Sequence, residues 1–280
     1  MKIVRRIGFI VIATAATLLC TLALTFNWAY SQAFDTSQFV STADTIYQDP
    51  SVQQEIAQTL VASLVGDTEL PAVIRKPLTT MTTELVSSET FHTFWVTAVE
   101  KIHQPLMKQL QSDAPLGKAA AVRVDLTEIV NPVLDDIRQK YPQASALLPT
   151  EAPLTEYQLL DADNMSTARD VVHLLSAIRW ILFALAIALL AGTSFLAHHS
   201  VRTTAITAAV GATIAYIASF IVPIVMQSAA STEHQDTARA IGVSLASPLR
   251  MNSLIVLLIG VGIAGASYVR QLRSRLQITP

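Results

Sequence analysis

Four long apolar stretches constrain this sequence more than any other feature. Each is close to the ~20 residues that a helix needs to cross the hydrocarbon core of a bilayer. Every backbone polar group inside hydrocarbon must be bonded within its own segment, so we expect all four stretches to be helices. The predicted spans are residues 7–29, 173–198, 203–226 and 250–269. The chain is therefore predicted to be a mainly α-helical membrane protein with four transmembrane helices.

The basic residues beside these spans predict the orientation of the chain. Short cytoplasmic segments of membrane proteins are enriched in Lys and Arg. If the N-terminus is cytoplasmic, three basic segments fall on that side: residues 1–6, the link at 199–202 and the tail at 270–280. Arg239 and Arg250 are the exceptions on the other side. We expect a multi-pass protein of the plasma membrane with both termini in the cytoplasm.

The first span has an alternative interpretation as a cleaved signal peptide, since Ser31 and Ala33 form a small-x-small site. Its apolar run is longer than the usual ~7–15-residue core of such a peptide, which favours an uncleaved anchor. The single cysteine, Cys20, lies inside this span. The region that follows has no disulfide, and its stability must come from core packing.

Residues 30–172 are predicted to form an exported domain. They hold 19 of the 21 acidic residues and nine Lys and Arg, a formal net charge of −10. Such a surface repels nucleic acid and favours cations or basic partners, so we exclude a nucleic-acid-binding role. Helical periodicity dominates the region. The runs 120–126 and 156–162 are β-like and could pair as a short two-stranded β-ribbon beside the helices.

The motif Glu-x-x-His occurs twice, at Glu89–His92 and at Glu100–His103. Di-metal carboxylate proteins place one copy on each of two facing helices. Both copies here lie in one predicted helix, where eleven residues at ~1.5 Å each separate the histidines by roughly 16 Å. Metal–ligand bonds are about 2 Å long, so the copies cannot share one ion. We interpret both histidines as half-buried residues beside an aromatic core face, with two separate weak metal sites as the alternative.

Two further features of the sequence are a candidate metal ligand and a set of candidate membrane-interface anchors. His234 is a weak third candidate metal ligand, in a segment (227–249) expected to be an exported loop with a short amphipathic helix. Arg179 lies within the second span beside Trp180, where a long basic side chain can reach the headgroups. We predict that Arg179, Trp180 and Trp28 are membrane-interface anchors.

Small residues at four-residue spacing allow helices to approach closely. We expect them to pack the third span against the fourth, with a seam between copies of a homo-oligomer as the alternative. The residues are Ala208, Gly211, Ala212, Ala215, Gly260, Gly262, Ala264 and Ala266.

The sequence contains no Gly-rich phosphate loop, paired-cysteine motif or nucleophile elbow. We therefore predict no catalytic residue, cofactor or resident metal. The leading hypothesis is a non-enzymatic scaffold whose acidic exported domain binds a protein partner or a cell-wall component, with membrane lipid around its spans. An accessory subunit of an envelope lipid or polymer transporter is the alternative, and a metal-dependent hydrolase is a weaker one.

Three stretches resemble uncharacterised integral membrane proteins of actinobacteria. They are FDTSQFVSTADTIYQDPSVQQEIAQTLVASL, AVRVDLTEIVNPVLDDI and YQLLDADNMSTARDVVHLL. The resemblance covers less than half of the chain. It implies an actinobacterial plasma membrane and a helical exported domain between the first and second spans, and it carries no functional residues.

Overall fold

The chain divides into two compact units in the computed structural model. The structure describes residues 2–65, 72–112, 122–124, 131, 135, 138–139, 157–160, 162–196 and 201–276. The first unit comprises Met1–Ser31, Leu174–Ala229 and Gly242–Pro280, and we call it the apolar unit. The second comprises Gln32–His173 and Ala230–Ile241, and we call it the polar unit.

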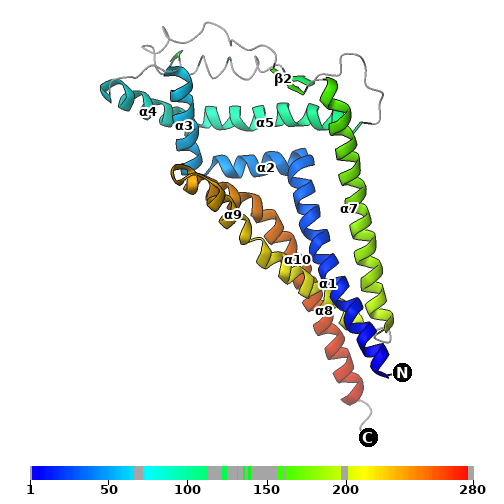
Figure 1. The fold of residues 1–280 in the computed structure, drawn as a ribbon. Coiled ribbons are helices and arrows are strands. Elements are labelled where there is room, and N and C mark those ends of the chain that lie inside the picture. Colours follow the sequence, from blue (N-terminus) through cyan, green and yellow to red (C-terminus); the bar gives the residue numbers. More distant parts are fainter. Residues whose placement is uncertain are drawn as a thin grey trace. The chain divides into compact units, whose positions relative to one another are not determined.

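Five helices of the chain contribute to the apolar unit (Figure 1). They are α1 (Lys2–Phe34), α7 (Ala162–Leu196), α8 (Val201–Ala218), α9 (Ile221–Ala229) and α10 (Gln235–Leu276). Four stretches of these helices are long and apolar enough to cross a membrane: Arg6–Phe34, Met165–Leu196, Val201–Ala229 and Thr232–Gln271. The prediction of four spanning segments is confirmed, and the chain is a multi-pass membrane protein.

The third of these segments is broken where α8 gives way to α9. Pro223 has no backbone N–H, so it cannot donate to the carbonyl of Ser219, and its ring clashes with that carbonyl in a continuous helix. The chain turns at Ser219 and Phe220 and re-enters a helix at Ile221. Pro223 then lies in the first turn of α9, where a missing N–H costs little.

The fourth segment differs from the prediction. We expected a separate short helix within residues 227–249, but only a 3-10 turn (Thr232–His234) precedes α10, which then continues unbroken through Pro248 to Leu276. The expectation of a separate helix is wrong. Pro248 removes one backbone hydrogen bond, but Ala246 and Leu249 beside it are almost fully buried. Packing of these neighbours offsets the lost bond.

Small residues bring the helices of the apolar unit together in two places. A Cβ atom on Gly260 of α10 would lie 2.8 Å from the carbonyl oxygen of Ala205 in α8, so this glycine permits the predicted approach of the two helices. Gly262 has nothing within 4 Å and takes no part. Gly211 of α8 packs on α1 instead, where the Thr21 hydroxyl donates to the Gly211 carbonyl at 2.9 Å.

The polar unit is built mainly from α2 (Thr36–Tyr47), α3 (Pro50–Val65), α4 (Ala72–Val86) and α5 (Glu89–Leu110). α2 packs along α5, and α3 packs along α4 (Figure 1). Asp35 and Ser88 cap the N-termini of α2 and α5, because their side chains accept backbone N–H groups that have no partner inside the helix.

Two short strands also belong to this unit. β1 (Val122–Val124) pairs antiparallel with β2 (Tyr157–Leu160), with Val124 opposite Tyr157 and an irregularity between Val122 and Arg123. The strands lie within the two runs that the sequence analysis identified as β-like. The structure describes few of the residues between the two strands.

Two apolar clusters stabilise the polar unit. The first contains Tyr47, Ala57, Val86 and Phe91, with Ile56, Leu60, Leu85, Phe94 and Trp95 packed against it. The second contains Met107, Leu110, Met165 and Val172, with Phe34, Leu106 and Ala168 packed against it. The second cluster joins the end of α5 to the start of α7. α7 continues without interruption into the second membrane span.

Candidate functional site

His103 is a core residue that bridges α5 to the start of α2. Only 5% of it is exposed, and its ring stacks on Phe39 with the centroids 4.2 Å apart. Its Nε2 lies 3.2 Å from the carbonyl oxygen of Ala33, and its Nδ1 lies 3.0 Å from the hydroxyl of Thr36. A carbonyl can only accept, so Nε2 carries the proton and Nδ1 accepts from Thr36. Burial lowers the pKa of His103, which favours this neutral form.

His92 has a different environment on the same helix. Its Nε2 lies 2.7 Å from a carboxylate oxygen of Asp44 in α2, and its Nδ1 lies 3.8 Å from Glu89. The hydrogen bond to Asp44 is the largest influence and raises the pKa of His92; burial opposes it, and the charges of Asp44 and Glu89 add to the rise. The His92 ring stacks on the ring of Tyr47, with the two ring centroids 5.2 Å apart. His92 therefore forms a charge-assisted link between α5 and α2.

The two Glu-x-x-His copies thus meet different partners. Glu89 lies near His92, while Glu100 is exposed on the surface. Within the part of the chain that the structure describes, no three His, Cys, Asp or Glu side chains gather closely enough to hold a metal ion. Both ring nitrogens of His103 are used in hydrogen bonds, and the Nε2 of His92 is used by Asp44. The geometry gives both histidines a structural explanation.

His234 also has a carboxylate partner. Its Nδ1 lies 3.1 Å from Glu55 of α3, and the hydroxyl of Thr237 lies 3.4 Å from the carbonyl oxygen of Ser51. These contacts fasten the segment before the fourth span to α3. The sequence does not reveal Glu55 as the partner of His234, because the two residues are far apart in the chain.

The predicted interface anchors make contacts within the apolar unit. The indole N–H of Trp28 donates to the carbonyl oxygen of Leu245 in α10 at 2.8 Å, so it joins two helices. The guanidinium carbon of Arg179 lies 4.9 Å from the ring centroid of Tyr30 and 5.4 Å from that of Trp180. These are cation–π distances, which favour a charge at the edge of an apolar region. Trp180 itself is 65% exposed.

Arg250 forms a third basic contact that the sequence does not reveal. Its guanidinium carbon lies 4.3 Å from the ring centroid of Phe220, and its Nε donates to the hydroxyl of Ser219 at 3.3 Å. Both partners lie in the turn between α8 and α9. Arg250 therefore stabilises the place where Pro223 breaks the third span.

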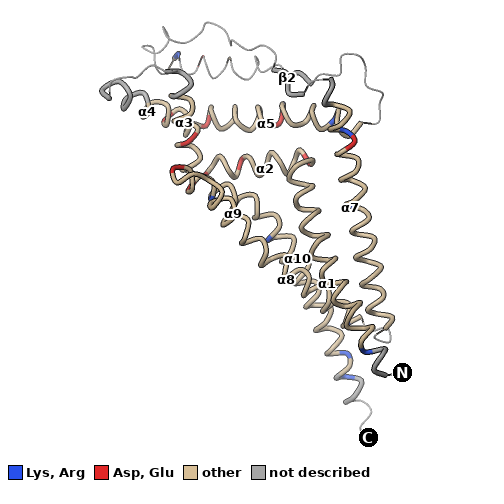
Figure 2. Tube along the Cα trace, in the orientation of Figure 1, with Lys and Arg blue, Asp and Glu red and all other residues tan. Residues whose placement is uncertain are grey.

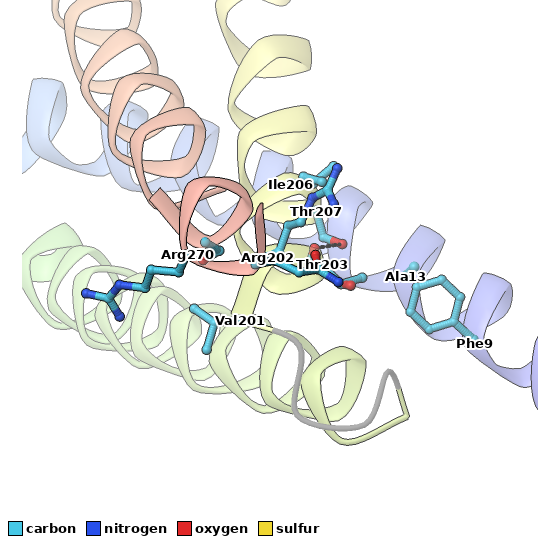
Figure 3. Close-up of a pocket in the computed structure, with 10 residues that line it drawn as sticks. Phe9, Ala13, Val201, Arg202, Thr203, Ile206, Thr207 and Arg270 are labelled. Carbon is cyan, nitrogen blue, oxygen red and sulfur yellow. Dashed lines mark hydrogen bonds between the residues drawn. The ribbon is translucent and has the colours of Figure 1, made fainter. Parts of the chain in front are cut away.

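A pocket with two arginines lies between α1, α8 and α10, inside the apolar unit (Figure 3). Its volume is about 860 Å³. Arg202, Arg270 and Gln271 supply the charged and amide groups, and Phe9, Ala13, Val201, Thr203, Ile206, Thr207 and Ser267 complete the lining. Sequence reasoning used its arginines only as indicators of orientation and did not predict a site.

The two units differ sharply in charge. The apolar unit contains nine Lys and Arg and no acidic residue, a formal charge of +9. The polar unit contains ten Lys and Arg and all 21 acids, a formal charge of −11, and the two values add to the −2 of the chain. Figure 2 shows described acidic residues on α2, α3 and α5 and near the starts of α7 and α10, while most of the length of the long apolar helices is uncharged.

No family model, curated protein or solved structure matches the chain. The resemblance to actinobacterial membrane proteins therefore stays a prediction. Function has to be argued from the charges and contacts of the molecule itself.

Proposed function

We propose that the protein is a non-enzymatic interaction or scaffold protein of the plasma membrane. Its spans anchor it with both termini in the cytoplasm, and its acidic polar unit faces the envelope, where it binds a basic partner protein or a cell-wall component that carries amino groups. The observation that carries this proposal is the separation of charge between the two units.

The charge of the polar unit supports its export. The cytoplasmic leaflet of a membrane is rich in anionic lipids and attracts basic segments. A unit with a formal charge of −11 would be repelled from that surface, whereas the basic ends of the apolar unit would be attracted to it. Both effects favour the same orientation, with the polar unit outside.

The acids of the polar unit are available to a partner. Most of those that the structure describes are exposed, so they can contact a basic surface without first leaving the core. These are Asp35, Glu84, Glu89, Glu100, Asp135, Asp170, Glu233 and Asp236. Electrostatic complementarity of this kind raises the association rate and selects partners by charge.

The histidines support an interaction role over hydrolysis. His92, His103 and His234 each contact a carboxylate or backbone group that holds two elements together. Both ring nitrogens of His103 are used in hydrogen bonds, so neither is directed at a substrate or an ion, as a catalytic or metal-bound histidine requires. The metal-dependent hydrolase is therefore the least supported of the alternatives.

A carbodiimide cross-linker tests this proposal, because it joins a carboxylate to an amine that is already in contact with it. Native membranes that contain the full chain would be treated at low and at high salt, and the adducts mapped by mass spectrometry. We expect links from the exposed acids, Glu100 and Asp170 among them, to lysines of one recurrent partner. These links should weaken at high salt because the contacts are electrostatic.

The double variant Glu100→Gln/Asp170→Asn keeps the shape of both side chains and serves as the mapping control. A recurrent partner should lose its links at these two positions in the variant and keep them elsewhere. Recovery of no recurrent adduct, or links that are unchanged by salt, would contradict the proposal. Recovery of a larger transporter would favour the accessory-subunit alternative.

A further inference from the structure

The pocket between α1, α8 and α10 lies in a strongly basic setting. Arg202 and Arg270 line it, and both side chains are exposed. The apolar unit contains no Asp or Glu, so no carboxylate of this unit can neutralise either arginine. An exposed pair of arginines without a carboxylate in its own unit attracts an anionic group from outside.

The lining of the pocket combines this charge with apolar surface. Arg202 and Arg270 come from α8 and α10, while Phe9 and Ala13 come from α1 and Ile206 from α8. The volume of about 860 Å³ is within the range of ligand sites in proteins. A ligand that fits both parts of the lining is amphiphilic, with an anionic end and an apolar end.

The hydroxyl groups of Thr207 and Ser267 do not supply donors to the pocket. Thr207 donates to the carbonyl of Thr203 at 3.0 Å, and Ser267 donates to the carbonyl of Ile263 at 2.8 Å. Their protons are thus bound within the helices. Arginine is well suited to replace them, because its guanidinium group binds phosphate through two parallel hydrogen bonds.

The two arginines are held differently. The guanidinium carbon of Arg202 lies 5.1 Å from the ring centroid of Tyr268, a cation–π contact that joins α8 to α10. In Figure 3 the Arg270 side chain extends away from Thr203 and Thr207. Arg202 is therefore the better positioned of the two to meet a ligand, and Arg270 adds charge at the rim.

We propose that this pocket binds an anionic phospholipid from the surrounding leaflet. Its phosphate lies at Arg202, and its glycerol and first acyl carbons lie against Phe9, Ala13 and Ile206. The pocket belongs to the unit that spans the membrane, so lipid is the ligand at the highest local concentration. Basic pockets between transmembrane helices are known to bind lipid headgroups in this way. This inference does not depend on the proposed function of the polar unit.

Thermal unfolding of the purified full chain in a neutral detergent tests the choice of ligand. The probes are phosphatidylglycerol, phosphatidylcholine and glycerol 3-phosphate. A ligand that binds only the folded state raises the melting temperature with increasing concentration. We expect phosphatidylglycerol to raise it and the other two to leave it unchanged. An equal effect of phosphatidylcholine would mean that charge plays no part, and an equal effect of glycerol 3-phosphate would mean a site for soluble phosphate; each would overturn the proposal.

Variants of matched charge test the position of the site. Arg202→Gln should weaken the apparent affinity for phosphatidylglycerol about fivefold, the usual effect of one basic residue on anionic lipid. Arg273→Gln removes the same charge from α10 at a position that does not line the pocket, and it should change the affinity less than about twofold. Equal losses in the two variants would mean a general surface effect and would refute a pocket.

A third variant keeps the charge and fills the space. Ala13→Phe adds bulk to the apolar wall of the pocket and should weaken phosphatidylglycerol binding as well. Native mass spectrometry of the wild-type chain provides a measurement that needs no variant. We expect one phosphatidylglycerol molecule to be retained per chain at a voltage that strips phosphatidylcholine, and a statistical distribution of both lipids would contradict the inference.

Discussion

Replacement of His103 is expected to weaken the junction between α5 and α2 in two separable ways. His103→Phe keeps the stacked ring against Phe39 but leaves the carbonyl of Ala33 and the hydroxyl of Thr36 without their partner. Thr36 is half-buried and Ala33 is exposed, so water replaces part of the lost bonding, and the variant should lose about 1–2 kcal/mol of opening free energy. His103→Ala removes the ring as well and should lose a further ~2 kcal/mol.

The pH dependence of the opening free energy shows whether the ring nitrogens of His103 are the cause of the loss. Burial places the pKa of folded His103 below the value of about 6.5 expected in the unfolded chain. Between these two pKa values the unfolded state binds more protons, so the contribution of His103 is complete above pH 6.5 and declines as the pH falls toward the folded pKa. His103→Phe has no proton to bind and should lose this part of the acid dependence.

Hydrogen exchange of the full chain in detergent measures both effects, with peptides from α5 and α2 followed between pH 5 and pH 8 and corrected for intrinsic exchange. Peptides from α10 within the apolar unit serve as an internal control and should not change. Opening free energies of His103→Phe within about 0.5 kcal/mol of wild type would refute the reasoning. They would mean that the ring nitrogens contribute nothing beyond packing, because the loss of two hydrogen bonds should cost about 1 kcal/mol or more.

Three other predictions concern the His92 pair, the contact between α10 and α8, and the orientation of the chain. Asp44 raises the pKa of His92, so the contribution of this histidine is complete below pH 6.5 and declines as the pH rises through the folded pKa; His92→Gln should remove that alkaline decline in hydrogen exchange. Gly260→Ala should lower the thermal stability of the full chain by about 1–3 kcal/mol, while Gly262→Ala on the same helix should not, because only the first Cβ meets α8. Reporter fusions at Pro280 should be cytoplasmic and fusions at Gln235 exported, and an exported Pro280 would contradict the predicted orientation.

The spanning segments could be predicted from sequence because their physical cause is local. A long uncharged stretch has to be helical in hydrocarbon whatever surrounds it. The ends of the helices were harder to predict from the sequence, because a proline breaks one helix and is tolerated inside another. Pro223 breaks the third span, whereas Pro105 and Pro248 lie inside α5 and α10. What differs is the packing around each proline, and packing joins residues that are far apart in the chain.

The partners of the two histidines could not be predicted from sequence either, because they too depend on contacts between distant parts of the chain. The helical wheel placed His92 and His103 beside the aromatic face of α5, and it separated them correctly by helical rise. It treated them as equivalent, however, and they are not: Asp44 faces one, and the carbonyl of Ala33 faces the other. As a result their pKa values shift in opposite directions. Only the position of α2 against α5 determines which partner each histidine meets.

The basic pocket was missed for a related reason. The sequence analysis used Arg202 and Arg270 only to predict their side of the membrane, and that rule says nothing of their position beside α1. The signal that could have indicated a site was present: nine bases and no acid in the segments that form the apolar unit. Orientation requires only an excess of bases near the ends of spans. Complete absence of acids leaves those arginines without a counter-charge inside the apolar unit, and anionic lipid is one source of such a charge. The pocket beside Arg202 offers lipid a defined place to supply it.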